Sequence, residues 1–384
     1  MQVKNNNSGW FFSGDPILLE TITPGVGNGF KGKPFLIGLD DEEVYRGAIC
    51  PPGVVDVSDI VDAAVPQIED PGSLETEAFK RIDNLEKYEF KVFSDSQFCG
   101  SFYALRGRTG DYALEEMSRR RSDIFADRFL NNSANRFLTT RTAGNIIRVK
   151  ESEVYPLLFV FDGDPIEVNV IDIVSGYKRA YNLTQPGIYA FSVNGARYQF
   201  LNSNLVLPSA LRIWFGDGFS CSILITEQEP AKERHIIKFR NSFGAFERVE
   251  MVSSVTETLE NKEADSSYME FNQATGRLSS RRANLIFNKT VEMKTGPKRP
   301  DEIRFILGMI ASDEVYIEDL QERPVRVIPL VDDISFSLNP DAPESLKIRF
   351  KVCDGSPFET DLQTHDNIGL TASVFNDVFN ENFK

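Results

Sequence analysis

The hexapeptide FSGDPI at residues 12–17 returns with one substitution as FDGDPI at residues 161–166. Each hexapeptide opens a β-rich segment, and a second echo lies near the end of each segment. There a Phe, an Asp and a Cys recur at the same spacing: Phe93, Asp95 and Cys99, then Phe215, Asp217 and Cys221. Gly, Asp and Pro are turn residues, so each hexapeptide marks a turn between extended segments. The two echoes predict two related β-domains in tandem, followed by a third region.

The composition favours a β-rich chain with no membrane or nucleic-acid role. The 384 residues leave room for several domains, and 30 Phe against 2 Trp favour half-buried pleated surfaces. The formal net charge of -15 argues against a general nucleic-acid binder, because phosphate binding needs a basic surface. The sequence holds no long apolar run, so no membrane insertion is expected. The polar N-terminus lacks the apolar segment of a signal peptide, which indicates synthesis in a cytoplasm.

Residues 1–105 are predicted to form a first β-sandwich module. Asp40-Asp41 separates two apolar runs and predicts a hairpin. Apolar residues near helical spacing predict a short helix within 54–65. The acidic stretch 67–86 is interpreted as an exposed excursion, and residues 88–105 close the module as a second hairpin.

Residues 154–228 are predicted to form a second, immunoglobulin-like β-sandwich. Its succession of about six or seven short strands is typical of that fold. Asn194-Gly195 and Asp217-Gly218 are strong hairpin dipeptides, and the first predicts a turn between strands at 187–193 and 197–201. The fold class expected is therefore mostly β, with tandem immunoglobulin-like sandwich modules and a third β-rich (α+β) region.

The third region, residues 235–353, is predicted to contain several strands and one helix near 301–311. Apolar residues of that helix share one face, and Asp301 and Glu302 favour its N-terminus. Residues 354–384 are predicted to be a polar C-terminal arm. Its aromatic residues are candidate contacts with other subunits: Phe375, Phe379 and Phe383.

Residues 106–153 are predicted to be a basic, irregular or helical insertion between the first two modules. The densest basic cluster in it is Arg119, Arg120 and Arg121. Three interpretations of this cluster stay open: a solvated helix face, a docking surface for an acidic neighbour such as another copy of the chain, and a nucleic-acid contact, which the net charge opposes. A long irregular segment of this kind more often has a function or binds a partner than serves only as a connection.

Residues that could support catalysis or metal binding are sparse. His235 and His365 are the only histidines, and neither lies in a nucleophile motif. The sequence has neither paired ligands at zinc spacing nor a phosphate-binding loop. Asp162 and Asp164 are the best candidates for Ca²⁺, but turn chemistry explains them as well. We therefore predict no catalytic, cofactor-binding or metal-binding residue.

The hexapeptide at 12–17, the segment Val54 to Val61 and the run IIKFRNSFGAFE at 236–247 together resemble virion proteins of phages and prophages of the Bacteroidetes, including crAss-like phages. In that family an F-x-G-x-P-I strand begins a β-sandwich. The resemblance implies a structural protein associated with the tail or connector, present in several copies around a ring or tube. It supplies no catalytic residue.

These observations predict a non-enzymatic structural subunit of a phage virion, of the tail or a tail ring. It would be made in the host bacterial cytoplasm and act in the virion, and its partners would be copies of itself and other virion proteins. Repeated symmetric contacts would add up without any one strong site. The two residue clusters already named, in the basic segment and the C-terminal arm, are the candidate interfaces.

Two alternatives remain at this stage. A carbohydrate-binding or adhesin-like module would bind a glycan on exposed aromatic platforms, for which the candidates are Trp10, Trp214 and Tyr189. Core packing is expected for both tryptophans, because they lie within predicted strands. A hydrolase that uses acidic pairs such as Asp162 and Asp164 is the second alternative.

Overall fold

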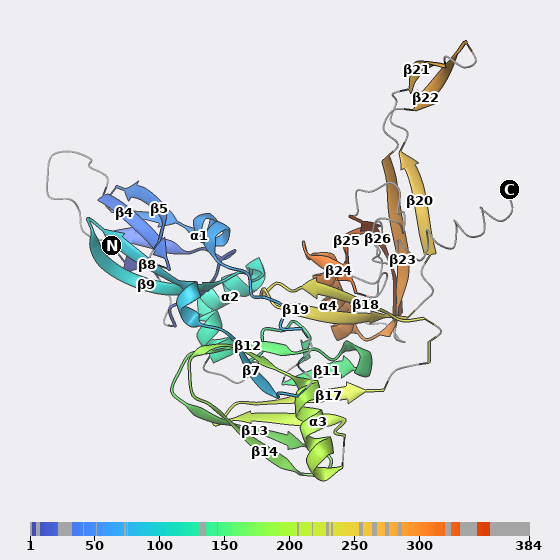
Figure 1. Cartoon of the computed structure of the whole chain (residues 1–384). Coiled ribbons are helices and arrows are strands. Elements are labelled where there is room, and N and C mark those ends of the chain that lie inside the picture. The colour runs from blue at the N-terminus through green and yellow to red at the C-terminus, as the bar shows by residue number, and fades with distance from the viewer. Residues whose placement is uncertain are drawn as a thin grey trace, which may run out of the picture.

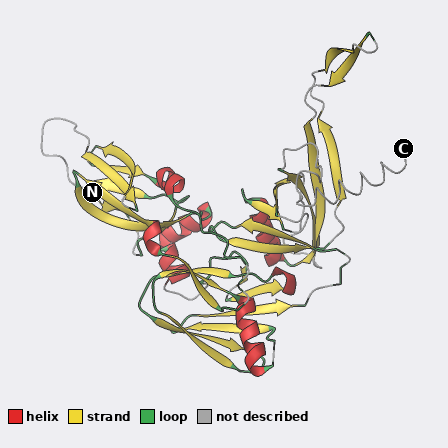
Figure 2. Cartoon of the chain, viewed as in Figure 1, coloured by secondary structure: helices red, strands yellow, loops and turns green. Residues whose placement is uncertain are grey.

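The computed structural model describes the following residues: 2–4, 8–21, 33–40, 42–50, 52–72, 74, 76–130, 136–143, 145–205, 207–216, 218–227, 230–231, 233–252, 256–262, 267–272, 276–282, 286–318, 324–330 and 344–353. Strands dominate, with a few helices between them (Figure 2). The β-rich fold class is therefore confirmed. Buried apolar side chains form three clusters, each centred on one of three modules. The first cluster also takes in side chains of the other two modules, among them Leu158, Ile188 and Phe243. No helix in the described ranges is long and apolar enough to cross a membrane.

The first module packs two sheets and a short helix around an aromatic core. Its larger sheet has the order β2 (Trp10–Phe12), β9 (Gln97–Leu105), β8 (Glu89–Ser94), β4 (Lys33–Leu39) and β5 (Glu42–Ile49). Its smaller sheet is β1 (Gln2–Val3), β3 (Leu18–Thr21) and β6 (Gly53–Asp56), and α1 (Ser58–Ala64) follows. The alternation of β8 points Phe90 and Val92 inward, where Phe90 stacks on Phe102 of β9.

The second module has the same general construction. Its larger sheet has the order β10 (Thr142–Ala143), β11 (Ile146–Lys150), β17 (Ser220–Thr226), β16 (Ala210–Phe215), β13 (Ile166–Asp172) and β14 (Lys178–Leu183). Its smaller sheet is β12 (Leu157–Phe161), β15 (Gly187–Phe191) and β7 (Phe79–Asp83), and α3 (Val193–Asn204) follows β15. Strand β11 lies within 106–153, and β7 comes from 67–86, so both regions contribute strands to this module.

Both larger sheets share one strand order, β2-β9-β8-β4-β5 in the first module and β11-β17-β16-β13-β14 in the second. In each, the first pair is parallel and the other pairs are antiparallel. The Phe-Asp-Cys echo falls on the corresponding hairpins β8–β9 and β16–β17. The hexapeptide echo does not fall on corresponding turns: it follows β2 of the larger sheet in the first module but β12 of the smaller sheet in the second.

The predicted hairpin turn at Asn194-Gly195 and the strand at 197–201 are wrong, because α3 occupies them. The hydroxyl of Ser192 caps this helix by accepting a hydrogen bond of 2.9 Å from the Gly195 amide. A Cβ on Gly195 would lie 2.2 Å from the carbonyl oxygen of Glu77. The glycine therefore serves close packing between α3 and the excursion of the first module, and no hairpin.

The prediction of an exposed excursion over 67–86 is also wrong. Strand β7 pairs with β15 of the second module, and Phe79 packs against Phe159 and Phe191 in that module's core. One strand of the first module's chain thus completes a sheet of the second. This contributed strand joins the two modules.

The third module is a seven-stranded sheet with one packed helix. The sheet order is β19 (Phe246–Met251), β18 (His235–Arg240), β24 (Val315–Ile317), β25 (Val325–Leu330), β26 (Glu344–Val352), β23 (Ile286–Lys298) and β20 (Thr256–Lys262). The predicted helix is confirmed as α4 (Pro300–Ile310), which buries Ile303 and Ile306. The predicted arm at 354–384, with its candidate phenylalanines, lies outside the described residues.

A two-stranded hairpin stands apart from the three modules. It consists of β21 (Ser267–Asn272) and β22 (Arg277–Arg282), which pair only with each other among the described strands. Figure 1 shows this hairpin beyond the far end of the β20–β23 pair, away from the modules. We call β21 and β22 the hairpin arm.

Candidate functional site

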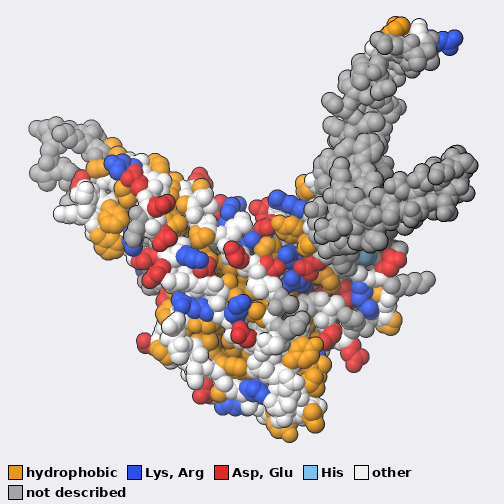
Figure 3. Space-filling view, viewed as in Figure 1, with side chains coloured by type: hydrophobic (Ala, Val, Ile, Leu, Met, Phe, Trp, Pro, Cys, Tyr) orange, Lys and Arg blue, Asp and Glu red, His pale blue; other side chains and the backbone are white. Residues whose placement is uncertain are grey.

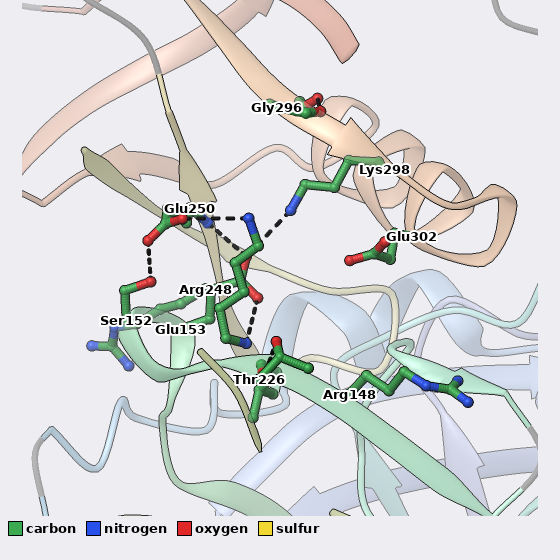
Figure 4. A network of polar contacts seen from close by, with 12 residues as sticks. Arg148, Ser152, Glu153, Thr226, Arg248, Glu250, Gly296, Lys298 and Glu302 are labelled. Atoms are coloured by element: carbon green, nitrogen blue, oxygen red, sulfur yellow. Dashed lines mark hydrogen bonds and ion pairs between the residues drawn. The ribbon is translucent and has the colours of Figure 1, made fainter. Parts of the chain in front are cut away.

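Buried charged side chains gather where the third module meets the second. We call this set the ionic junction: Arg141, Lys150, Glu153, Glu247, Glu250 and Lys298. Glu153, Glu247, Glu250 and Lys298 are all at most 2% exposed. Such groups persist in an interior only when they are paired and hydrogen-bonded. Figure 4 shows Glu153, Glu250 and Lys298 converging from different elements.

Glu153 forms ion pairs with two cations of the junction. Its carboxylate pairs with Arg141 and accepts hydrogen bonds from the backbone amides of Lys150 at 3.2 Å and Glu250 at 2.9 Å. Lys298 Nζ of the third module lies 3.6 Å away. Burial alone would raise the pKa of Glu153, but Arg141 and Lys298 lower it to about 2. The carboxylate is therefore held ionised.

Glu250 and Glu247 bring β19 into the same network. Glu250 accepts a hydrogen bond from the Ser152 hydroxyl, and Lys150 Nζ lies 3.4 Å from its carboxylate. Glu247 accepts hydrogen bonds from the Tyr155 hydroxyl at 3.0 Å and the Thr140 amide at 2.8 Å. These bonds cross from β19 to the chain segment that leads into the second module.

The turn at 241–245 connects the third module to the first. The Asn241 side chain accepts hydrogen bonds of 3.0 Å from the amides of Phe243 and Ala245, which shapes the turn. The Arg108 amide then donates a hydrogen bond of 2.7 Å to the Ser242 carbonyl. Gly244 has a φ of +78°, and a Cβ there would lie 1.9 Å from the Arg106 carbonyl oxygen. The turn therefore docks closely on the end of the first module.

A half-buried group of ion pairs extends this contact. Asp70 from the first module's excursion lies 3.0 Å from Lys238 and 3.5 Å from Arg248 of the third. Burial opposes ionisation of Asp70, but Arg248 and neighbouring donors bring its pKa below the usual range. Arg248 also forms a two-pronged pair with Glu318 at 2.8 Å. These ion pairs fix the orientation of the third module relative to the excursion of the first.

The Glu153 pKa predicts an acid-sensitive junction. A carboxyl whose folded pKa lies below its unfolded value stabilises the fold above the unfolded pKa, and this contribution is lost as the pH falls from about 4.5 towards 2. The shift corresponds to about 3 kcal/mol. Glu153→Gln should lower the unfolding free energy by about that amount at pH 7 and flatten its slope between pH 5 and 2, measured by denaturant titration. Glu115→Gln, at an exposed site, is the control; parallel pH profiles for wild type and Glu153→Gln would contradict the assignment.

A cavity of about 580 Å³ lies in the first module next to α2 (Asp111–Arg120). Its lining combines apolar and polar side chains, among them Trp10, Phe11, Leu114, Met117, Asp15 and Arg121. Burial raises the pKa of Asp15, although the Thr109 amide donates a hydrogen bond of 2.8 Å to its carboxyl group. The cavity has no group of convergent charges comparable with the junction.

The predicted arginine cluster lies at the end of α2, and its members do different things. Arg119 pairs with Glu115 and Arg120 with Glu116, one helical turn away, and both arginines are exposed. Arg121 takes the left-handed conformation that ends the helix and lines the cavity. Whether a partner binds this cluster stays a prediction.

The aromatic platform candidates separate clearly. Trp10 is fully buried, as expected, and donates a hydrogen bond of 2.7 Å to Asp162 of the second module. Tyr189 is 7% exposed. Core packing of Trp214 was the wrong expectation: this side chain is 43% exposed, because its position on β16 faces away from the core.

The junction residues were missed at the sequence level. Their one local signal is a pair of glutamates in the apolar strand FERVEM, where Glu247 and Glu250 interrupt core positions. Their partners in the segment that leads into the second module lie 92 to 107 positions away, so no local pattern reveals these contacts. Within the described ranges, no group of three or more His, Cys, Asp or Glu side chains could hold a metal ion.

Comparisons with known proteins give little further guidance. No family model matches the chain, and no curated protein matches it. Among solved structures, it is similar to a chain of the tail of an empty GTA particle refined with C6 symmetry, at 12% identity over 33% of this chain and 96% of that one, with a TM-score of 0.24. It is also similar to a chain from a study of a 1.5-MDa bacterial ice-binding adhesin, at 11% identity over 73% and 86%, with a TM-score of 0.14. At such TM-scores neither likeness defines the fold or the function.

Proposed function

We propose that this chain is a non-enzymatic structural subunit of a phage virion, a tail or tail-ring protein that assembles in several copies. The observation that carries the proposal is the hairpin arm, which presents apolar side chains to solvent beyond the body of the subunit (Figure 3). Met269, Phe271 and Leu278 are between 57% and 61% exposed. Phe271 pairs directly with Leu278, and Met269 lies two residues before Phe271. All three therefore share one face.

An isolated two-stranded hairpin is at best marginally stable in water, so an apolar hairpin arm calls for a partner surface. The arm sequence, residues 267–282, contains three arginines and one glutamate within a chain of net charge -15. A basic, apolar arm on an acidic protein fits the surface of another copy. The outer strands β5 and β14 leave sheet edges along which further contacts can form.

We also propose that the first two modules are copies of one immunoglobulin-like module. The shared strand order and the matching Phe-Asp-Cys hairpins support this. The strand β7 then joins the first module to the second, and the ionic junction joins the second to the third. Together they make one rigid building block. Rigid blocks suit symmetric assembly, because the relative orientation of their contact surfaces is set in advance.

The hairpin arm gives the test of assembly. Wild-type protein is expected to form oligomers whose mass in solution exceeds that of the monomer, and to occur in several copies in purified phage particles by mass spectrometry. Changing Met269, Phe271 and Leu278 together to Ser should reduce the oligomer to a monomer that keeps the wild-type circular dichroism spectrum, because these side chains are exposed. A triple variant with Ser at Tyr112, Val174 and Leu205, which are 75% to 87% exposed, is the control and should keep the wild-type oligomer.

Two results would overturn the proposal. One is a wild-type chain that stays monomeric at every concentration and is missing from particles. The other is an assembly that survives the arm substitutions unchanged, since the hairpin arm would then have no part in it.

A further inference from the structure

The outer face of the second module's larger sheet carries a set of side chains that the assembly proposal does not use. Strand alternation points Val168, Val170 and Ile213 into the core, and the residues between them point the other way. Trp214 of β16 lies opposite Asn169 of β13 on one side and Ser220 of β17 on the other. We call Glu167, Asn169, Arg212, Trp214, Ser220 and Ser222 the outer sheet face.

Asn169 gives this face a second distinctive feature. Its side chain is 3% exposed, yet it lies on the outer side of the sheet. Its Nδ2 donates a hydrogen bond of 2.9 Å to Glu167, whereas its Oδ1 has no hydrogen-bond partner in the described part of the chain. Buried polar atoms are nearly always paired, so an unpaired amide oxygen next to an exposed indole indicates a missing donor.

We propose that the outer sheet face binds a saccharide, with one sugar ring stacked on Trp214. A pyranose ring has a face of C–H groups, which packs well on the electron-rich face of an indole. Its hydroxyl groups point outward from the ring, where they need both donors and acceptors. Asn169 and Ser220 flank the indole directly, and the exposed side chains of Glu167 and Arg212 lie at neighbouring positions.

The chemistry of the face favours a sugar over other ligands. An apolar protein partner would need a continuous apolar patch, but the neighbours of Trp214 across both strands are Asn169 and Ser220. A polyanion such as nucleic acid would meet a chain of net charge -15. A neutral sugar carries hydroxyl donors of the kind that Asn169 Oδ1 lacks.

The experiment uses the two tryptophans of the full chain. Trp10 is fully buried, so iodide quenching of fluorescence reports on Trp214. The protein is first applied to a glycan array, and each bound glycan is then titrated while quenching is followed. We expect the glycan to protect Trp214 from iodide. Trp214→Ala should weaken binding by about tenfold or more, which corresponds to loss of one good contact.

Controls separate a binding role from a structural one. Tyr198→Ala removes an equally exposed aromatic ring on α3 and should leave the affinity unchanged. Asn169→Ala should weaken binding while Trp214 keeps its quenching in the free protein. All three variants should keep the wild-type assembly mass, so this test stands apart from that of the hairpin arm.

The proposal is overturned if the wild-type chain binds no glycan at millimolar concentration, or if Trp214→Ala leaves the affinity intact. It is also overturned if rising protein concentration without sugar protects Trp214, because the outer sheet face would then be a contact between copies of the chain.

Discussion

Replacing Arg141 with Met is expected to lower the free energy of unfolding by about 3–5 kcal/mol, the usual cost of removing one partner of a buried ion pair. Arg141 pairs with Glu153, and its guanidinium lies 4.1 Å from the ring centre of Phe305 in α4. It also donates a hydrogen bond to the Arg248 carbonyl of β19. The substitution leaves the buried charge of Glu153 without its Arg141 partner. It also removes the contacts of Arg141 with the third module.

Denaturant unfolding at pH 7 checks this expectation, with Arg119→Met as the control. Arg119 also pairs with a glutamate, but on the exposed surface of α2, so its loss should change stability by no more than about 0.5 kcal/mol. Equal effects of the two substitutions would show that the ionic junction does not depend on Arg141.

Gly244→Ala is expected to cost about 3 kcal/mol or more. The left-handed conformation of this residue accounts for about 1 kcal/mol. The rest comes from overpacking, since the new Cβ would lie 1.9 Å from the Arg106 carbonyl oxygen and one of the two backbones must move. The turn at 241–245 would then be forced away from the first module.

Gly176→Ala provides a matched control. Its φ of +76° is nearly that of Gly244, but a Cβ there would meet nothing within 4 Å. The difference in unfolding free energy between the two variants therefore isolates the contact with Arg106. Limited proteolysis should also cut Gly244→Ala faster near residues 106–110. Equal stabilities would mean that the turn can shift without loss.

Local patterns predicted much of the strand content. The dipeptide Asp40-Asp41 located the hairpin β4–β5, and the spacing of Ile303 and Ile306 located α4. The echo of Phe, Asp and Cys marked hairpins that do occupy corresponding places in two sheets of the same order. These features depend on residues close in sequence, which is why a single chain reveals them.

Features that depend on distant partners escaped prediction. Asn194-Gly195 has strong hairpin chemistry, but the cap at Ser192 and close packing against Glu77 favour a helix there. The acidic excursion contains Ala78 and Phe79, which anchor it in another module's core. The ionic junction joins Glu153 to Lys298, and the local sequence around either residue does not predict the other as its partner.

The placement of β7 in a sheet of the second module has a consequence for folding during synthesis. During synthesis the first module leaves the ribosome before β12 and β15 exist, so β7 must wait with its hydrogen-bonding edge open until about residue 191 has emerged. Contacts that span such long separations form slowly, and open strand edges attract other chains in the meantime. We therefore expect the nascent first module to be the stage of synthesis most prone to aggregation.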